Sequence, residues 1–390
     1  MKRVGPARRR RRAAALLAVP LAAALVVSCG TGDGRTMARA LPADADFTHP
    51  GVLVGKDQLT AVRKNVTAGK QPWLKAYLDM RDSKYGSYKY RPEPHETVIC
   101  PADGRPGHGC AEERADAIAA YTQALLFTVT GKRQHAVKAR EILDAWSGRL
   151  KGHGIQDAGW AASTWARAAE IVRHTPGADW PAERVRRFED MLRSVHLPAV
   201  GVKVPGRSGG QDLVMTDAAI SIAVFLDDHK AFDRALERFR ARVPVYFSGK
   251  NGVTQDTCRG LREVGRGIAA TAHIAETAWH QGVDLYDEVK DRLTAALTLH
   301  ARRQAGEPVS AASCGGRVGG GGKSGSVGQA GSRMGPGLEV ALHHLEDRLG
   351  GSVPAAHRLA AGSRPAGTDN LFVAWETLTH VAKPGEKPAG

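Results

Sequence analysis

Apolar side chains recur at helical spacing through most of this chain, in pairs of segments separated by short breaks. The first pair comprises Ile118, Tyr121, Leu125 and Val129, and then, after Gly131, Val137, Ile142, Leu143 and Trp146. A helix buries one face at a period of 3.6 residues, so these segments predict two amphipathic helices joined by a turn. No convincing alternation of apolar and polar residues, which would indicate a strand, interrupts the pattern.

The same pattern returns further along the chain. It comprises Trp165, Ala168, Ala169 and Val172; Val185, Phe188, Leu192 and Val195; Phe232, Leu236, Phe239 and Val243; and the segments 267–280 and 287–302. Helical hairpins at similar spacing over more than 250 residues predict an all-α fold, an incomplete (α/α) toroid. A helical solenoid has the same periodicity and is the alternative.

The N-terminus has the order of features that is typical of an export signal. Basic residues run to Arg12, apolar residues occupy 13–27, and Ser28-Cys29-Gly30 follows. Fifteen apolar residues are too few for a permanent membrane span, which needs roughly 20. The residues that end in Cys29 resemble a bacterial lipobox, which implies that Cys29 is lipidated; a plain secretory signal is the alternative. We therefore predict a lipoprotein signal peptide at 1–29 and an exported protein, lipid-anchored at the outer face of the bacterial cell membrane or secreted.

The remaining chain is basic. The net charge is +15, and residues 1–29 contribute seven basic and no acidic side chains, which leaves +8 for the rest. A basic surface attracts polyanions. The basic residues are scattered and are not interleaved with aromatic residues, so we predict an acidic polysaccharide as the partner and no nucleic acid. We expect membrane contact through the N-terminal lipid only, and a monomer.

Four cysteines remain after Cys29, enough for two disulfides in an exported protein. Cys100 and Cys110 enclose a segment rich in proline and glycine, PADGRPGHG, which a local bridge would order. That pairing leaves Cys258 to bridge Cys314. Metal binding is the rival use of cysteine, but CxxC and HExxH spacings are absent, so we predict no metal site.

Amino-acid composition distinguishes a tether, a folded domain and a glycine-rich segment in the rest of the chain. Residues 30–48 are small and polar, as in a flexible tether, and the folded domain is expected at 49–385. Residues 315–337 contain eleven glycines and almost no apolar residue, which predicts a mobile loop over one face or a disordered insertion. The sequence GGGGKSG within it lacks the GxxxxGK(S/T) spacing of a phosphate-binding loop.

Segments from nearly the whole chain after residue 47 resemble the alginate lyase family in order and spacing. After a His-Pro-Gly-Val opening they are ERADAIAAYTQALLFTVTGK, AGWAASTWARAAEIVRHT, VFLDDHKAFDRALERFRARVPVYF, QDTCRG, AETAWHQGVDLYDE and SRPAGTDNLFVAWETLTH. The resemblance implies an (α/α) toroid with an open cleft, lyase activity on a uronic-acid polysaccharide such as alginate, and no redox cofactor.

A lyase of this kind carries out β-elimination. A base removes the proton at carbon 5 of the uronic acid, and an acid protonates the leaving oxygen at carbon 4. The proton becomes acidic enough only when the neighbouring carboxylate is neutralised, so hydrogen-bond donors must hold that carboxylate. The resemblance implies four residues for neutralising the carboxylate and transferring the proton: an asparagine, a histidine, an arginine, and a tyrosine seven residues after the arginine.

Several of these positions are occupied by other residues. Arg259 stands at the arginine position, but Arg266 stands seven residues later, where the tyrosine is expected. Ser208-Gly209-Gly210-Gln211 replaces the loop that would hold the asparagine. Either catalysis was lost and glycan binding kept, or the site was rebuilt for another acidic glycan with Glu263 or a histidine as base. A different alignment of the two loops is a third explanation.

The candidate catalytic residues are therefore Arg259, Glu263 and Arg266, and the candidate substrate-binding residues are Arg167, Trp160, Gln211 and Asp212. An aromatic ring beside a cation suits a sugar ring and its carboxylate, which favours Trp160 and Arg167, with core packing as the alternative for Trp160. Gln211 and Asp212 suit sugar hydroxyls, although Asp212 also suits the cap of the following helix. Tyr246 is a displaced acid or base candidate, and packing in the core is its simpler explanation.

Overall fold

The computed structural model describes residues 1–2, 40–42, 45–100, 107–155, 157–202, 209–249, 251–307 and 333–381. The chain divides into two units, Met1–Thr36 and Met37–Gly390, and every helix described below belongs to the second. Cys29, Ser208, Cys314 and most of the glycine-rich segment lie outside the described residues, so the predictions for them stay predictions. Within the described part of the chain, no helix combines the length and the apolar character that crossing a bilayer requires.

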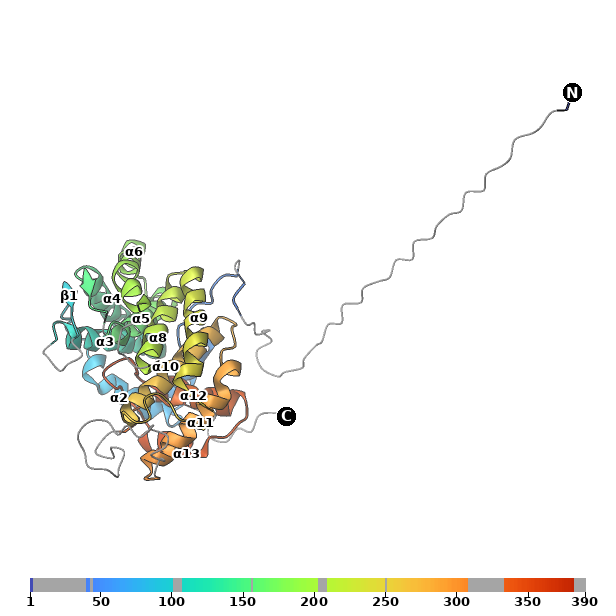
Figure 1. Ribbon diagram of the computed structural model, residues 1–390. Helices are drawn as coiled ribbons and strands as arrows, with labels where there is room; N and C mark the ends of the chain where they lie inside the picture. The colour runs from blue at the N-terminus through green and yellow to red at the C-terminus, as the bar shows by residue number, and fades with distance from the viewer. Residues whose placement is uncertain are drawn as a thin grey trace. The chain divides into compact units, whose positions relative to one another are not determined.

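Helices account for almost all regular structure of the described residues (Figure 1). The α-helices are α1 (Lys56–Thr67), α2 (Trp73–Asp82), α3 (Cys110–Thr130), α4 (Arg133–Ser147), α5 (Gly159–His174), α6 (Ala182–Met191), α7 (Leu197–Gly201), α8 (Gly209–Phe225), α9 (His229–Tyr246), α10 (Leu261–His280), α11 (Tyr286–Gln304), α12 (Glu339–Leu342), α13 (Pro354–Ser363) and α14 (Glu376–His380). The other elements are a 3-10 turn η1 (Lys84–Gly86), π-helical segments η2 (Leu192–His196) and η4 (His343–Arg348), and the parallel strands β1 (Thr97–Val98) and β2 (Gly152–His153).

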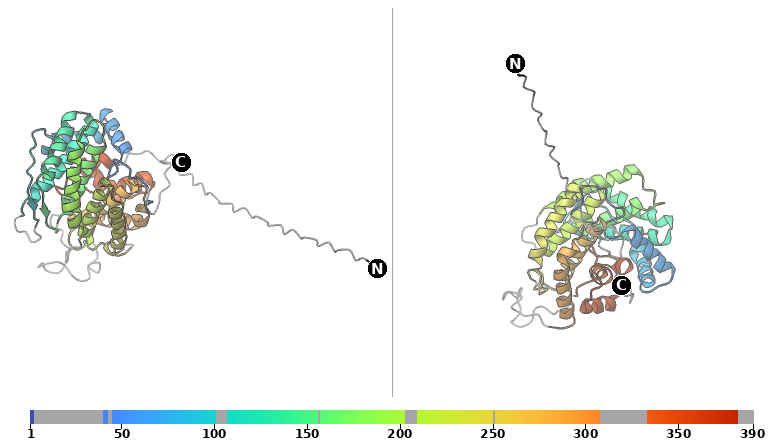
Figure 2. Two further views of the ribbon diagram at one scale, coloured as in Figure 1. Left: turned by 90° about the horizontal axis from the view of Figure 1, so that it is seen from above. Right: turned by 90° about the vertical axis from the view of Figure 1, so that its right-hand side faces the viewer.

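The helices form a ring of hairpins. Helices α3, α5, α8 and α10 pack side by side in chain order, and α4, α9 and α11 pack against α3, α8 and α10. The row continues from α10 to α12 and α14, and α14 contacts α1, which contacts α3. The first and last helices therefore meet, as the right-hand view of Figure 2 shows. This arrangement confirms the all-α class and the (α/α) toroid, and it excludes the open solenoid.

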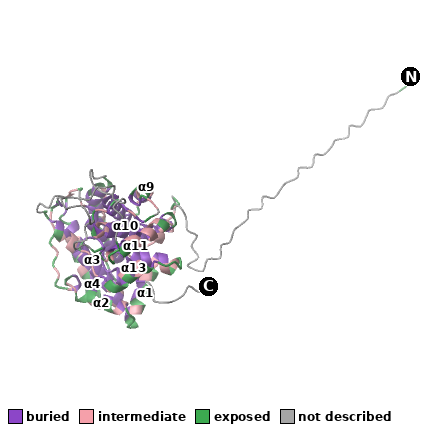
Figure 3. Ribbon diagram, turned by 60° about the horizontal axis from the view of Figure 1, so that its bottom comes forward, coloured by how far each residue is buried: buried purple, intermediate pink, exposed green. Residues whose placement is uncertain are grey.

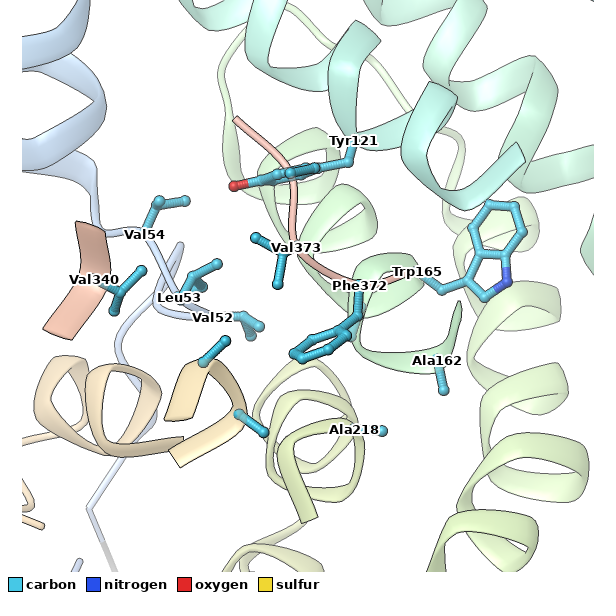
Figure 4. Close-up of a cluster of buried hydrophobic side chains, with 14 of the residues drawn as sticks. Val52, Leu53, Val54, Tyr121, Ala162, Trp165, Ala218, Val340, Phe372 and Val373 are labelled. Atoms are coloured by element: carbon cyan, nitrogen blue, oxygen red, sulfur yellow. The ribbon is translucent and has the colours of Figure 1, made fainter. Parts of the chain in front are cut away.

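The ring encloses a continuous apolar core. All 17 residues of α8 are buried, because this helix has neighbours on every side. Figure 3 shows buried segments throughout the interior and exposed ones on the outer helices. The side chains labelled in Figure 4 come from distant parts of the chain and include Val52, Leu53, Val54, Tyr121, Ala162, Trp165, Ala218, Val340, Phe372 and Val373.

Two details differ from the helices expected from the sequence. Helix α10 begins at Leu261 rather than near residue 267, so Glu263 and Arg266 are helical. Gly260, with φ 144°, precedes the first helical residue in a backbone conformation that suits glycine. Val137 was expected on the buried face of α4, yet it is 45% exposed.

The cysteine predictions are confirmed in part. Cys100 and Cys110 form a disulfide, with Cα atoms 5.5 Å apart. Cys258 is disulfide-bonded as well, and its expected partner Cys314 lies outside the described residues.

Candidate functional site

A pocket of about 380 Å³ opens at the N-terminal end of α10, the helix that carries two of the predicted catalytic residues. Its walls come from α10, from the segment 333–337 before α12 and from the loop 369–373 before α14. The lining residues are Arg262, Gly265, Arg266, Arg333, Met334, Gly335, Pro336, Gly337, Asp369 and Val373. The volume is in the range of sites that bind small ligands, roughly 300–1,000 Å³.

Positive charge dominates this site, which we call the arginine pocket. Among the described lining residues, Arg262, Arg266 and Arg333 carry positive charge and Asp369 carries negative charge. Arg262 and Arg333 are exposed, and the structure gives neither an ion-pair partner among the described residues. The dipole of the 20-residue helix α10 adds positive potential at this end. The arrangement suits an anionic ligand such as a carboxylate.

Arg266 is held between an aromatic ring and an acid. Its guanidinium carbon lies 5.2 Å from the centre of the Trp160 ring, and its Nη1 lies 3.7 Å from Glu263 Oε1. Burial lowers the pKa of Arg266, while Asp369 and Glu263 oppose that change. Trp160 is 8% exposed and packs on Phe372, with ring centres 5.6 Å apart. The structure thus brings three predicted site residues, Trp160, Glu263 and Arg266, together beside the pocket.

Asp369 supplies the carboxylate of the pocket lining. Its Oδ1 accepts hydrogen bonds from the backbone N–H groups of Leu371, Phe372 and Val373, at 2.9, 3.1 and 3.0 Å. Burial raises the pKa of Asp369, although these bonds and Arg266 favour its charged form. A carboxylate with a raised pKa among cations in a pocket is a candidate proton acceptor.

Two glycines allow the wall of the pocket to lie directly on α10. A Cβ atom on Gly265 would lie 2.0 Å from the carbonyl oxygen of Met334, and one on Gly337 would lie 2.5 Å from the Cβ of Ala269. Side chains do not tolerate such distances, so the segment 333–337 approaches α10 because these positions are glycine. The glycine one residue before Arg266 therefore shapes the pocket.

Arg259 lies in the segment before α10 and is not among the lining residues. Its side chain is 51% exposed, and its Nη1 lies 3.7 Å from a carboxylate oxygen of the buried Asp256. The guanidinium is therefore accessible on the surface. Its role in holding a substrate carboxylate stays a prediction.

Arg167 lies in the interior, which corrects its assignment to the cleft. It is 1% exposed, and its guanidinium donates hydrogen bonds to Asp217 Oδ2 at 2.6 Å and to the carbonyl oxygen of Phe372 at 2.7 Å. The same group lies 2.9 Å from His273 Nδ1, and His273 Nε2 lies 2.6 Å from Glu376. We call Arg167, Asp217, His273 and Glu376 the buried network. Because Arg167 is buried and already paired with Asp217, its guanidinium is not accessible to a ligand.

Gln211 and Asp212 also lie away from the lining of the pocket. They belong to the first turn of α8 rather than to a loop, and each residue is 9% exposed. The Asp212 carboxylate pairs with Arg238 and Arg242 of α9. These ion pairs occupy the carboxylate and link α8 to α9, which corrects the assignment of Asp212 to the substrate.

Tyr246 packs in the interior, as its simpler explanation proposed. It is fully buried at the end of α9, and burial raises the pKa of its hydroxyl well above the ordinary value. A Cβ atom on Gly267 would lie 1.9 Å from that hydroxyl, so the tyrosine fills space that the glycine leaves open. This position excludes Tyr246 from the arginine pocket.

Sequence reasoning did not assign the three other charged residues of the pocket, Arg262, Arg333 and Asp369, to the site. One signal was present, because Arg262 and Arg266 are four residues apart and share a face once the helix begins at Leu261. The local sequence does not show that residues 333 and 369, which belong to different segments, both lie beside the N-terminal end of α10.

Comparison with known proteins gives the same fold. A model of the alginate lyase family matches residues 65–310. Alginate lyase A1-III from Sphingomonas species A1 matches in structure with a TM-score of 0.61 and 18% identity, over 87% of this chain and 98% of that chain. A tyrosine-to-phenylalanine variant of alginate lyase A1-III, complexed with tetrasaccharide, matches with a TM-score of 0.62 and 17% identity, over 88% of this chain and 99% of that chain.

At these identities the structural likeness shows the fold alone, and no curated protein matches the sequence. The family match covers more than half of the chain and agrees with the ring of helical hairpins. The family match supports a function as a polysaccharide lyase. This chain therefore belongs to the alginate lyase family.

Proposed function

We propose that this protein is a polysaccharide lyase that cleaves a uronic-acid-containing polymer by β-elimination at the arginine pocket. One observation carries the proposal: three arginines and one aspartate are among the described residues that line the same pocket. Removal of the carbon-5 proton drives negative charge into the neighbouring substrate carboxylate. Fixed cations that face this carboxylate stabilise the charge as it develops.

Arg262, Arg266 and Arg333 would share the substrate carboxylate. A guanidinium presents paired N–H donors that match the two oxygens of a carboxylate. Arg266 is the best held of the three, since Trp160 and Glu263 fix its position. Arg259, accessible in the segment before α10, would contact a neighbouring acidic sugar of the polymer.

Asp369 is the base that this proposal favours, with Glu263 as the alternative. Asp369 lines the pocket, and its raised pKa brings it closer to the range in which a carboxylate accepts a proton efficiently. Glu263 lies beside the pocket, and its carboxylate faces Arg266. Replacement of each acid by its amide separates the two assignments.

A second candidate function is glycan binding without cleavage. Arg266 occupies the position at which the family resemblance implies the proton-transferring tyrosine, and Gly210-Gln211 stands where an asparagine is implied. An arginine stays protonated at neutral pH, so it cannot replace the tyrosine as a base. A site without a competent acid and base would still bind an acidic polymer through its cations.

The test is to incubate the purified full chain with alginate, glucuronan, hyaluronan and heparin-like polymers while following ultraviolet absorbance. Elimination produces an unsaturated sugar that absorbs, whereas binding alone does not. We expect product from at least one polymer, a loss of at least about tenfold in Arg266→Ala, and little change in Arg186→Ala, a control on the exposed face of α6. In Asp369→Asn, kcat should fall more than in Glu263→Gln.

Absence of product from every polymer, together with binding that weakens in Arg266→Ala, would replace the lyase by the binding protein. Neither product nor binding would remove both functions from the arginine pocket. Thermal unfolding of each variant is recorded beside the assay, because Asp369 also orders the loop 369–373 through its backbone bonds.

For localisation we propose a lipid anchor on Cys29 at the outer face of the bacterial cell membrane. The support is the sequence order of basic, apolar and Ser28-Cys29-Gly30 segments. Metabolic labelling with a fatty-acid analogue should mark the expressed protein, and Cys29→Ser should abolish the label. Release of an unlabelled wild-type protein into the medium would favour the plain secretory signal.

A further inference from the structure

We propose that Glu113, His153 and His196 form a binding site for one divalent transition-metal ion of the zinc type. They come from three elements: the first turn of α3, strand β2 and the end of the π-helical segment η2. One ligand atom from each lies within 4.8 Å of the other two. Two imidazoles and a carboxylate are a ligand set that zinc accepts.

The spacing of the ligand atoms suits such an ion. His153 Nε2 lies 2.9 Å from Glu113 Oε2, and His196 Nε2 lies 3.4 Å from Glu113 Oε1. Two ligands at 2.0–2.1 Å from a tetrahedral zinc ion are about 3.3 Å apart. The two separations, each to a different oxygen of Glu113, lie on either side of this value. All three side chains are 2% exposed or less.

His196 gives the independent indication. Its side chain is 0% exposed, and neither ring nitrogen has a hydrogen-bond partner among the residues that the structure describes. Native proteins rarely leave a buried polar group without a hydrogen bond, because its lost hydration is then uncompensated. A cation between His196 and Glu113 would give His196 Nε2 a partner at a place where the Glu113 carboxylate is already close.

The other two ligands are already oriented. His153 Nδ1 lies 2.6 Å from the carbonyl oxygen of Gly154, and donation of its N–H there directs Nε2 to Glu113. Trp165 Nε1 donates to Glu113 Oε1 at 3.3 Å. A histidine that binds a metal through one nitrogen usually donates from the other to a carbonyl or carboxylate, which fixes the ring.

A second cluster of possible ligands consists of His49, Glu170 and His174, and ion pairs alone account for its histidine His49. His49 has a carboxylate partner on each nitrogen, Glu170 at 2.6 Å and Asp227 at 2.9 Å, and its pKa is raised. Protonated His49 is therefore fully satisfied without a metal, although His174 lies close enough to complete a ligand set. The contact of His153 with Glu113 likewise satisfies His153, but neither nitrogen of His196 hydrogen-bonds to a described residue.

Three protein ligands leave one position of a tetrahedral ion for water. The ion would join α3 to the short sheet and to the break between α6 and α7, where η2 interrupts the helical path. We therefore expect the bound metal to stabilise the fold. None of the three ligands lines the arginine pocket, so the metal site and the proposed lyase function are independent.

The experiment measures metal in the full chain after dialysis against metal-free buffer, by elemental analysis. We expect about one zinc ion per chain and a cobalt-substituted form with the visible absorption of a tetrahedral site. Chelation by EDTA should lower the Tm by about 5 °C or more, and zinc should restore it.

His196→Gln should lose both the stoichiometric metal and the effect of EDTA. The matched control is His135→Gln, because His135 is also buried but has Gln123 and Tyr88 as hydrogen-bond partners. If His196→Gln does not fold, X-ray absorption of the zinc-loaded wild type must show nitrogen and oxygen ligands with two imidazoles. No retained metal and no effect of EDTA on the wild type, or equal metal in both variants, would overturn the proposal.

Discussion

Helix α10 carries charged side chains in two places that the fold treats differently. In its first two turns, Arg262 and Arg266 face the arginine pocket. In its middle, His273 and Glu276 are fully buried. Glu276 accepts two hydrogen bonds from Arg348, both 2.7 Å long, and His273 belongs to the buried network.

The difference lies in how the charge is balanced. A buried charge is tolerated when an opposite charge and hydrogen bonds compensate its lost hydration, which is the situation in the middle of α10. The pocket arginines are more numerous than the acids that face them, so their charge favours an anionic ligand. The buried charges should therefore govern stability, and the pocket charges should govern binding.

The largest effect should come from breaking the buried network. Arg167→Met leaves Asp217 buried without its closest cation, and we expect the free energy of unfolding to fall by about 3–5 kcal/mol in urea denaturation. Arg262→Met changes an exposed arginine of the pocket, so its effect should stay within about 0.5 kcal/mol. Similar losses in the two variants would contradict the division between interior and pocket.

A smaller effect should appear in the acid range. The Arg348 guanidinium and His280 hold the pKa of Glu276 well below its ordinary value, although burial alone would raise it. A carboxyl with a depressed folded pKa contributes stability that is present above about pH 4.5 and is lost as pH falls further. The unfolding free energy of the wild type should therefore fall between pH 5 and pH 3 more steeply than that of Glu276→Gln, by up to about 1.4 kcal/mol per pH unit. Parallel curves would show that Glu276 is not protected in this way.

The smallest effect in energy should come from salt. Raising ionic strength from 0.1 M to 1 M shortens the screening length from about 10 Å to about 3 Å. Binding of an acidic polymer, measured by calorimetry, should weaken about tenfold, and Arg333→Ala should flatten this dependence while Arg186→Ala should not. The unfolding free energy of the wild type should change much less, since the network is screened poorly by ions in solvent. Salt-independent binding would show that the pocket arginines do not contact the polymer.

The fold was largely predictable because helical periodicity records burial directly. The predicted helix at 287–302 corresponds to α11, Tyr286–Gln304, where one face packs on the ring. The start of α10 was missed because Glu263-Val264-Gly265-Arg266 mixes charged residues with a glycine and has no apolar repeat. Gly265 is needed because the backbone of Met334 approaches it closely, and helix propensity contains no information about this tertiary contact.

The candidate site was only half predictable. Sequence reasoning placed Trp160, Glu263 and Arg266 together, and in the structure Arg266 lies beside both Trp160 and Glu263. It placed Arg167 and Asp212 in the same cleft, but both have ion-pair partners elsewhere. A residue type that suits a sugar also suits a buried ion pair, and only the partners distinguish the two.

The sequence by itself determined the class of fold, the family and the local disulfide between Cys100 and Cys110, because periodicity, motif order and short loops are written along the chain. The tertiary structure decided which charges are balanced and which face a pocket. It also decided that Glu113, His153 and His196, each about forty residues from the next, converge in the interior. Closure of the ring creates these neighbours, and no spacing along the chain encodes them.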